Sequence, residues 1–322
     1  MTGNGIETVA IVGAGMMGTG LAAEYAATGH TVTLFARTES SAVRAKERTY
    51  TALDSLAAAG VLGADEMPAA RDRVRASTDL SDAVAGADLV VESIPENLVL
   101  KREMFVTLET ICPATTILAS NTSGIPITQI AARMRHPERF IGTHYLNPPH
   151  LMPPVEVIPG EQTDPAIVAR VRDNLAAMGK SPVVVGKEAP GFLWNRLQYA
   201  ILREACHIVE QGIATKEEVD MVMRQGLARR WSIVGGPFAS LDLGGIGTSA
   251  LVGAYLFPAL SGATDVPPTL AEPVAAGRTG AESGAGFYDW PPERLKQTLD
   301  HRNAKLVAAL REDRDGSGAP AQ

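Results

Sequence analysis

Short apolar runs alternate with helix-like stretches along the first part of the chain. Residues 8–12 (TVAIV) and 31–35 (TVTLF) are rich in β-branched residues and predict strands, whereas residues 16–28 predict a helix that ends at Gly29. The alternation continues with strand-like runs at residues 87–92, 116–119, 139–144 and 182–185. Strands that alternate with helices are typical of a parallel sheet covered on both faces. We therefore predict an α/β fold with a doubly wound, mostly parallel sheet.

The pattern changes after Pro190 and Gly191. Apolar residues then recur at helical spacing over residues 197–209, and Thr215 with Glu218 forms a capping-box pattern that opens another helix. The following segment is helical in pattern, and residues 312–322 (EDRDGSGAPAQ) have the composition of a disordered tail. We predict a sheet domain over residues 1–188, an all-α domain over residues 189–311 and a tail over residues 312–322.

Composition limits the classes of function. The 322 residues, 45% of them hydrophobic, suffice for two domains with buried cores. A net charge of −7 argues against nucleic acid as a partner, because its phosphates require an excess of Lys and Arg. The chain has only two cysteines, no apolar run of about 18 residues and no signal-peptide pattern at its N-terminus. We expect a cytoplasmic protein without membrane contacts, whose cysteines are buried as small apolar residues.

A glycine-rich turn lies between the first predicted strand and the first predicted helix. Residues 13–18 read Gly-Ala-Gly-Met-Met-Gly and match the G-x-G-x-x-G pattern of dinucleotide-binding proteins. In that pattern Gly13 permits the tight turn, Gly15 lets a pyrophosphate approach the backbone, and Gly18 lets the helix pack close to the strand. The position of the motif predicts dinucleotide binding at the helix N-terminus, with Met17 beside it.

The end of the second strand bears on the choice of dinucleotide. NAD-binding folds place Asp or Glu there to hold the ribose 2′-hydroxyl, but this chain has Ala36 followed by Arg37. Arg37, Thr38 and Ser40 could bind the 2′-phosphate of NADP instead. Arg37 could also simply cover the adenine ring, and Glu39 could serve as a late ribose acceptor. We predict NADP in preference to NAD.

A histidine and a glutamate on neighbouring predicted strands are the candidate acid–base pair. His144 ends one strand, Glu156 lies in the next short strand, and a Pro-rich loop can bring the two side by side. A carboxylate on one imidazole nitrogen fixes the tautomer, so the other nitrogen can take a proton from an alcohol. The alternative is a hydrogen-bonded structural histidine. Ser123 and Asn147 are further candidates, although both residue types also favour turns. The spacing of His and Cys predicts no metal site.

Several segments in order resemble the 3-hydroxyacyl-CoA dehydrogenase family. They are GAGMMG, VVESIPENLVLKREMF, ASNTSGIPIT, GTHYLNPP, VEVI, PGFLWNRL and GAGFYDW, and the resemblance covers residues 8–290. It implies a Rossmann-type domain, then an all-helical domain through which the protein forms a homodimer. The apolar stretch 250–260 (ALVGAYLFPAL) is the candidate contact, unless it is an ordinary buried helix.

The resemblance also implies roles for single residues. His144 would be the general acid/base and Glu156 its partner, while Ser123 and Asn195 would hold the substrate oxygens. For Asn195, helix capping is the alternative. The residues it implies near the cofactor or the histidine are Glu96 and Lys101 at the nicotinamide-side ribose, Asn121 at the cofactor and Asn147 beside His144.

The substrate stays open at this stage. Acyl-CoA members hold CoA with a basic helical hairpin, and residues 41–78 here contain one lysine and five arginines, which neither exclude nor favour CoA. The sequence NPPHLMPPVEV and the pair Arg230-Trp231 resemble a small-substrate branch of the family more than its acyl-CoA members. That branch includes gulonate dehydrogenase with lambda-crystallin, carnitine dehydrogenase and a dehydrogenase of vitamin B6 breakdown. Arg230 could bind a substrate carboxylate, or be a surface residue or part of an ion pair in a dimer. Three hypotheses follow: a dehydrogenase of small hydroxy acids or related hydroxy compounds, a 3-hydroxyacyl-CoA dehydrogenase, and a non-catalytic nucleotide-binding protein.

Overall fold

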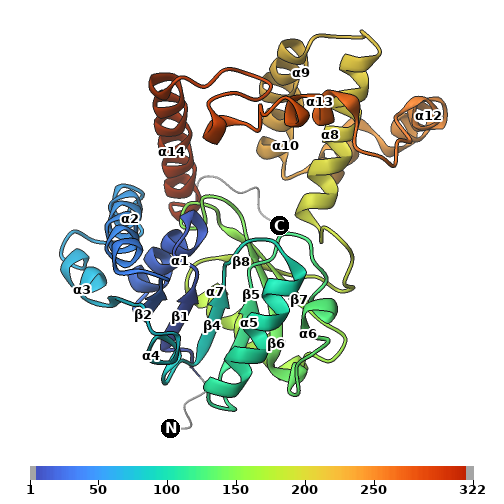
Figure 1. Ribbon diagram of the computed structural model, residues 1–322. Helices are drawn as coiled ribbons and strands as arrows, with labels where there is room; N and C mark the ends of the chain where they lie inside the picture. The colour runs from blue at the N-terminus through green and yellow to red at the C-terminus, as the bar shows by residue number, and fades with distance from the viewer. Residues whose placement is uncertain (1–4, 317–322) are drawn as a thin grey trace. The chain divides into compact units, whose positions relative to one another are not determined.

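The computed structural model describes residues 5–316, which divide into two compact units (Figure 1). Unit 1 comprises residues up to 196 together with 303–311, and unit 2 comprises residues 197–302 together with those from 312 onward. Unit 1 thus extends a few residues beyond the predicted boundary at 188. The extension has a physical reason, because the backbone N–H groups of Leu193 and Trp194 bond to a carboxylate of the sheet.

Unit 1 is built on one eight-stranded sheet with the order β3-β2-β1-β4-β5-β6-β7-β8. All neighbouring strands are parallel except β6 and β7, which are antiparallel, as a short connection without a crossover requires. The prediction of a doubly wound, mostly parallel sheet is confirmed. The strands are β1 (Thr8–Val12), β2 (Thr31–Phe35), β3 (Val74–Ser77), β4 (Leu89–Glu92), β5 (Ile117–Ser120), β6 (Phe140–Tyr145), β7 (Pro154–Pro159) and β8 (Ser181–Val184).

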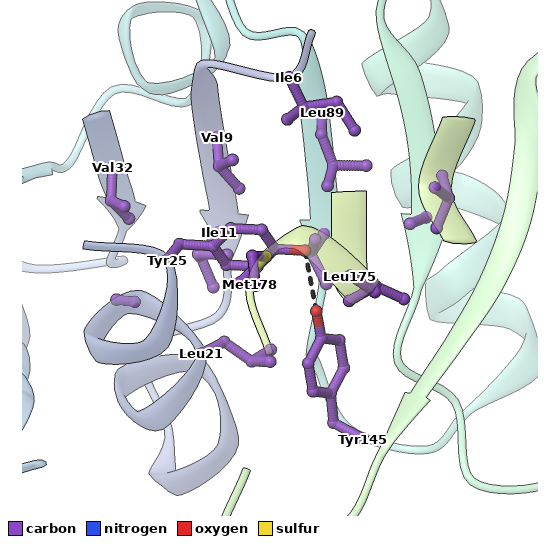
Figure 2. Packing of buried hydrophobic residues seen from close by; sticks show 14 of the residues in the cluster. Ile6, Val9, Ile11, Leu21, Tyr25, Val32, Leu89, Tyr145, Leu175 and Met178 are labelled. Carbon is purple, nitrogen blue, oxygen red and sulfur yellow. Dashed lines mark hydrogen bonds between the residues drawn. The ribbon is translucent and has the colours of Figure 1, made fainter. Parts of the chain in front are cut away.

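Helices cover both faces of this sheet (Figure 1). One buried cluster joins alternate residues of β1, such as Val9 and Ile11, to α1 and α7 (Figure 2). The intervening residues Ala10 and Val12 belong to a second cluster with α4, α5 and α6 on the other face. The helices are α1 (Met16–Ala27), α2 (Glu39–Ala58), α3 (Met67–Asp72), α4 (Leu80–Val84), α5 (Leu98–Ile111), α6 (Ile127–Ala131), η1 (Pro137–Arg139) and α7 (Pro165–Ala177).

Unit 2 consists of helices, as the sequence predicts. The capping box is present, because Thr215 Oγ1 accepts a hydrogen bond from the N–H of Glu218 and the Glu218 carboxylate accepts one from the N–H of Thr215. The helices from the start of the helical region onward are α8 (Trp194–Glu210), α9 (Lys216–Val222), η2 (Met223–Leu227), α10 (Ala228–Val234), α11 (Pro237–Gly244), α12 (Ile246–Leu256), η3 (Phe257–Ala259), α13 (Pro268–Ala275), η4 (Ala281–Ser283) and α14 (Pro292–Arg314).

Two further sequence predictions concern chain segments in or beyond this helical region. Helix α14 runs to Arg314, so the first residues of the predicted disordered tail are helical, and residues 317–322 lie outside the described part of the chain. Across residues 5–316, no single helix is long and apolar enough to cross a membrane. By length and composition alone one bent pair would qualify, at residues 237–244 and 246–259 with an angle of 108° between them.

Candidate active site

The glycine loop between β1 and α1 is shaped for close approach of a ligand. Gly13 has φ +129°, and a Cβ there would lie 2.4 Å from the carbonyl oxygen of Ser93. A Cβ on Gly18 would lie 1.8 Å from the carbonyl oxygen of Gly13, whereas one on Gly15 would meet open space. Helix α1 begins directly after Gly15, without a side-chain cap or an acidic residue in its first turn. The loop therefore fits a pyrophosphate at the helix N-terminus, beside the half-buried Met17.

The end of β2 lies next to this loop in the sheet. Ala36 is buried and Arg37 is exposed. Thr38 caps α2, since its Oγ1 accepts from the N–H of Ser41, and the Glu39 carboxylate accepts from Thr78 Oγ1 at 3.0 Å. Among these side chains, the Arg37 guanidinium is the cation that faces solvent at the end of the strand.

His144 and Glu156 face each other across the antiparallel pair β6 and β7, where their backbones are in register. Their side chains are 6% exposed each, and His144 Nδ1 lies 2.6 Å from Glu156 Oε2. The second carboxylate oxygen accepts hydrogen bonds from the N–H groups of Leu193 and Trp194 at 2.7 and 2.9 Å. The first turn of α8 therefore holds the carboxylate that orients the imidazole, while the ring of Phe192 packs 5.9 Å from that of His144.

The electrostatics of this pair favour an ionised carboxylate. Burial alone would raise the pKa of Glu156, but the hydrogen bond to His144 and those from Trp194 and Leu193 lower the pKa below its ordinary value. A carboxylate on Nδ1 fixes the imidazole tautomer with the proton on that nitrogen. Nε2 is then the nitrogen left without a proton, which is the arrangement that general acid–base chemistry requires.

The loop after β5 carries Ser123, and residues from two other segments hold this loop. Asn195 Nδ2 donates to the backbone carbonyl of Ser123 at 2.5 Å, so Asn195 is joined to the Ser123 loop. Glu96 holds the same loop, because its Oε1 accepts from Thr122 Oγ1 at 2.5 Å and from the N–H groups of Ser123 and Gly124 at 2.9 and 3.2 Å. The structure thus brings Ser123, Asn195 and Glu96 together and leaves the Ser123 side chain exposed.

Lys101 lies deeper than a direct ribose contact would suggest. Its side chain is 1% exposed, and its amine lies 2.7 Å from Glu92 Oε1, 3.3 Å from the carbonyl of Ile94 and 3.4 Å from Glu96 Oε2. These three acceptors match the three N–H donors of the ammonium group. Glu92, which also accepts from Ser120 Oγ at 2.6 Å, was missed by the sequence analysis. A charged residue ending an apolar strand (LVVE) was the available signal.

Two asparagines near His144 differ in their contacts. Asn121 is buried, and its Oδ1 accepts from the N–H of Tyr145 at 2.9 Å while its Nδ2 lies 3.4 Å from Ser93 Oγ. Ser93 also lies against Gly13. Asn121 therefore links the strand that carries His144, through Ser93, to the glycine loop. Asn147 is exposed on the loop after β6. The predicted role of Asn147 beside His144 is therefore not supported by a hydrogen bond between these two residues.

Arg230 belongs to unit 2, in α10. Its side chain is exposed, and its guanidinium donates to the carbonyl of Ser240 at 3.5 Å. In residues 5–316 no group of three or more His, Cys, Asp or Glu side chains is arranged to hold a metal ion.

The chain is similar to known dehydrogenases over nearly its whole length. Residues 8–189 match the NAD-binding domain of 3-hydroxyacyl-CoA dehydrogenase, and residues 191–290 match the C-terminal domain of that enzyme. It is 40% identical over 307 residues to 5-formyl-3-hydroxy-2-methylpyridine 4-carboxylate 5-dehydrogenase of Mesorhizobium japonicum, covering 95% of this chain and 98% of the relative. It is 36% identical over 301 residues to L-carnitine dehydrogenase of Streptomyces griseus, covering 92% and 89%.

Solved structures agree with these relatives. A crystal structure of a 5-formyl-3-hydroxy-2-methylpyridine 4-carboxylic acid 5-dehydrogenase, described as an NAD+-dependent dismutase, superposes with a TM-score of 0.90 at 39% identity and covers 97% of this chain and 99% of its own. The (S)-3-hydroxybutyryl-CoA dehydrogenase of Ralstonia eutropha superposes with a TM-score of 0.72 at 34% identity, covering 89% and 99%.

The doubly wound sheet and its glycine loop define a dinucleotide-dependent dehydrogenase of the Rossmann type. More particularly, the chain belongs to the 3-hydroxyacyl-CoA dehydrogenase family, as the sequence motifs predicted. It is an NAD(P)-dependent oxidoreductase with the NAD-binding domain of that family, and its similarity to the pyridine carboxylate and carnitine enzymes agrees with the predicted small-substrate branch.

Proposed function

We propose that this protein interconverts a hydroxyl group and a carbonyl on a small hydroxy acid or related compound without CoA, with His144 and Glu156 as the acid–base pair. The observation that carries the proposal is the buried 2.6 Å contact between His144 Nδ1 and Glu156. The β6 strand that bears His144 is linked through Asn121 and Ser93 to the glycine loop.

In the oxidising direction, Nε2 of His144 takes the hydroxyl proton while the carbinol carbon loses its hydride. A nicotinamide dinucleotide held at the glycine loop would supply the acceptor for that hydride. Glu156 remains a carboxylate throughout and stabilises the imidazolium. The Asn195 side chain, in the first turn of α8, donates to the backbone carbonyl of Ser123, and together with the exposed Ser123 hydroxyl it would hold the substrate oxygen. An aldehyde substrate would react by the same route in its hydrated form, because the hydrate carries a hydroxyl group and a C–H bond on one carbon.

Three of the five arginines in residues 41–78 have partners of their own, whereas the two on α2 are exposed, so this region alone does not decide for or against CoA. Arg71 pairs with Asp54 at 2.8 Å, and Arg75 pairs with Asp82 at 2.8 Å. Arg73 donates to the carbonyl of Ala26 at 3.1 Å. A CoA phosphate would have to compete with these partners. The alternative function, which the family name favours, is a 3-hydroxyacyl-CoA dehydrogenase, with 3-hydroxybutyryl-CoA as the particular substrate.

For the cofactor, NAD is the dinucleotide of the family model and of the pyridine carboxylate enzyme. The predicted preference for NADP stays a proposal. What supports it is the exposed Arg37 beside Ala36, where an acidic residue would repel a 2′-phosphate. Glu39 Oε1 accepts a hydrogen bond from Thr78, but the exposed carboxylate keeps further acceptor sites, so Glu39 remains the alternative as a ribose acceptor.

We also propose a homodimer formed through unit 2. The stretch predicted to contribute is exposed rather than an ordinary buried helix, with Leu251, Tyr255 and Phe257 exposed by 76%, 70% and 76%. Large exposed apolar patches mark interaction surfaces in globular proteins. A second copy of the chain is the partner that the family resemblance implies.

A substrate panel tests the proposed function. Purified enzyme with NAD+ or NADP+ is offered 5-formyl-3-hydroxy-2-methylpyridine 4-carboxylate, L-carnitine, L-gulonate and (S)-3-hydroxybutyryl-CoA, and the nicotinamide absorbance is followed. We expect kcat/KM to be highest for a free acid or zwitterion. A CoA thioester that exceeds every free acid would replace this proposal with the acyl-CoA alternative.

A further inference from the structure

A second group of buried titratable side chains lies beneath the loop that joins β6 to β7. Glu24 and Lys180 are 3% and 9% exposed, and Lys180 Nζ lies 3.0 Å from Glu24 Oε2. Next to them the hydroxyl groups of Tyr25 and Tyr145 share a hydrogen bond of 2.8 Å (Figure 2). The acid–base step proposed above uses none of these four groups.

Lys180 ties down the loop itself. Its amine donates to the backbone carbonyls of Pro149 at 3.0 Å and Met152 at 3.3 Å. The same amine lies 3.0 Å from Glu24 Oε2 as an ion pair, so one ammonium group contacts both the loop and helix α1. Residues 146–153 connect the strand of His144 to the strand of Glu156, so the position of this loop constrains the ends of both strands.

The other side of the cluster belongs to α1, the helix that starts at the glycine loop. Glu24 and Tyr25 lie near its C-terminal end, and Gly20 lies one turn before Glu24. A Cβ on Gly20 would approach Pro149 Cγ to 2.6 Å, so the helix touches the loop directly. Tyr145, the partner of Tyr25, immediately follows His144. Two direct contacts, and a third that runs through Lys180, therefore join helix α1 to the chain segment after His144.

The chemistry of the pair indicates what it contributes. Burial raises the pKa of Glu24, an effect that Lys180 opposes, and removing two charges from water costs several kcal/mol of solvation per ion. Replacing such a pair with apolar groups of similar volume is often neutral or stabilising. The two hydrogen bonds from Lys180 to loop carbonyls, however, fix the position of the β6–β7 loop, which apolar side chains at these sites would not do.

We propose that Glu24 and Lys180 are positioning residues that fix the β6–β7 loop, and with it His144, relative to helix α1 and the dinucleotide. This inference rests on the proposed role of His144. Hydride and proton transfer depend on alignment, and a misplacement of about 1 Å can cost roughly 100-fold in rate.

The test compares Lys180→Met with the double variant Glu24→Gln/Lys180→Met. The single variant leaves a buried carboxylate without its cation and is expected to lose stability, whereas the double variant removes both charges at similar volume. Lys296→Met is the matched control, because it removes an exposed Lys–Asp pair of 2.7 Å on α14.

Four quantities are measured for each protein. Thermal unfolding gives stability, and fluorescence titration with NADH gives the stoichiometry of cofactor binding. Turnover of 5-formyl-3-hydroxy-2-methylpyridine 4-carboxylate is expressed per bound cofactor. The downfield proton resonance of the His144 Nδ1–H, identified by its loss in His144→Gln, reports the His144–Glu156 contact without any substrate.

We expect the double variant to unfold at or above the temperature of the single variant and to bind NADH with unchanged stoichiometry. Its kcat should fall about 10- to 100-fold with KM within about twofold, and the His144 resonance should shift or broaden. The control should match the wild type. A double variant with wild-type turnover and an unchanged resonance would overturn the proposal. Where the wild type does not turn over this substrate, the His144 resonance alone tests the proposal. Undiminished turnover in His144→Ala would instead refute the proposed acid–base role.

Discussion

The two units of the chain differ in where their apolar residues lie. Unit 1 buries three apolar clusters between its sheet and helices. In the described part of unit 2, Cys206 is the buried apolar side chain, while Phe238, Leu243 and Leu251 are 83%, 76% and 76% exposed. A self-contained core can stabilise the first unit alone, whereas the second presents apolar surface that a partner would cover.

The candidate functional groups follow the same division. In unit 1, His144 and Glu156 are buried and fixed by hydrogen bonds to each other and to the backbone. In unit 2, Arg230 is exposed and makes one long contact to a carbonyl. The candidate acid–base pair is therefore held rigidly in the sheet unit, whereas the candidate substrate anchor in the helical unit is held by one long contact.

The largest expected effect tests the chemistry assigned to unit 1. His144→Ala should lower kcat about 10²- to 10⁴-fold, because it removes the general base. NADH affinity should stay near the wild-type value, since the imidazole is not assigned to cofactor binding. Steady-state kinetics and fluorescence titration measure the two quantities. A folded variant with near-normal turnover would end the assignment of catalysis to this residue.

The second prediction concerns the surface of unit 2. Leu251→Asp should weaken the homodimer by about 3 kcal/mol, roughly 100-fold in dissociation constant, if this side chain is buried between two copies. Light scattering over a range of micromolar concentrations measures the mass. Val43→Asp changes an exposed apolar residue of unit 1 and serves as the control. A wild-type protein that is monomeric at micromolar concentration would contradict the dimer itself.

The third prediction concerns the substrate anchor. Arg230→Met should raise KM for an acid substrate about 10- to 100-fold, the value of a charge-assisted pair of about 1.5–3 kcal/mol. Binding of NADH should not change. Arg229→Met, next to it on α10, is the matched control. An unchanged KM for every acid tested would remove Arg230 from the substrate site.

The fourth and smallest effect concerns cofactor choice. If Arg37 binds a 2′-phosphate, NADPH should bind more tightly than NADH, and Arg37→Ala should erase a difference of about tenfold. Isothermal titration with both reduced dinucleotides gives the two affinities. Tighter binding of NADH by the wild type would show that the exposed arginine does not select the phosphate.

Much of the fold could be predicted because its signals are local. The strands at residues 8–12 and 31–35 have the predicted bounds, since β-branched runs beside glycine turns leave little choice. Strand β3 escaped prediction because VRAS is short and contains a single β-branched residue, and its place is set by pairing with β2. The facing of His144 and Glu156 was predictable from two adjacent strands and a short loop.

Other parts of the site depend on contacts that no local pattern encodes. Glu24 stands within an apolar helix, and only the tertiary fold brings it to Lys180, which is distant in sequence. The same holds for the N–H groups at the start of α8 that bind Glu156. Lys101 matched a motif, but the motif could not reveal that its amine is surrounded by protein oxygens.

The glycine loop and the end of β2 will respond very differently to protein engineering. Any side chain at Gly18 would collide with the backbone of Gly13, and any at Gly13 would collide with Ser93, so libraries gain nothing from varying either position. Arg37 and Ser40 are exposed, and substitutions there need displace no neighbour from the core. A search for altered coenzyme use should therefore hold the loop constant and randomise the end of the strand.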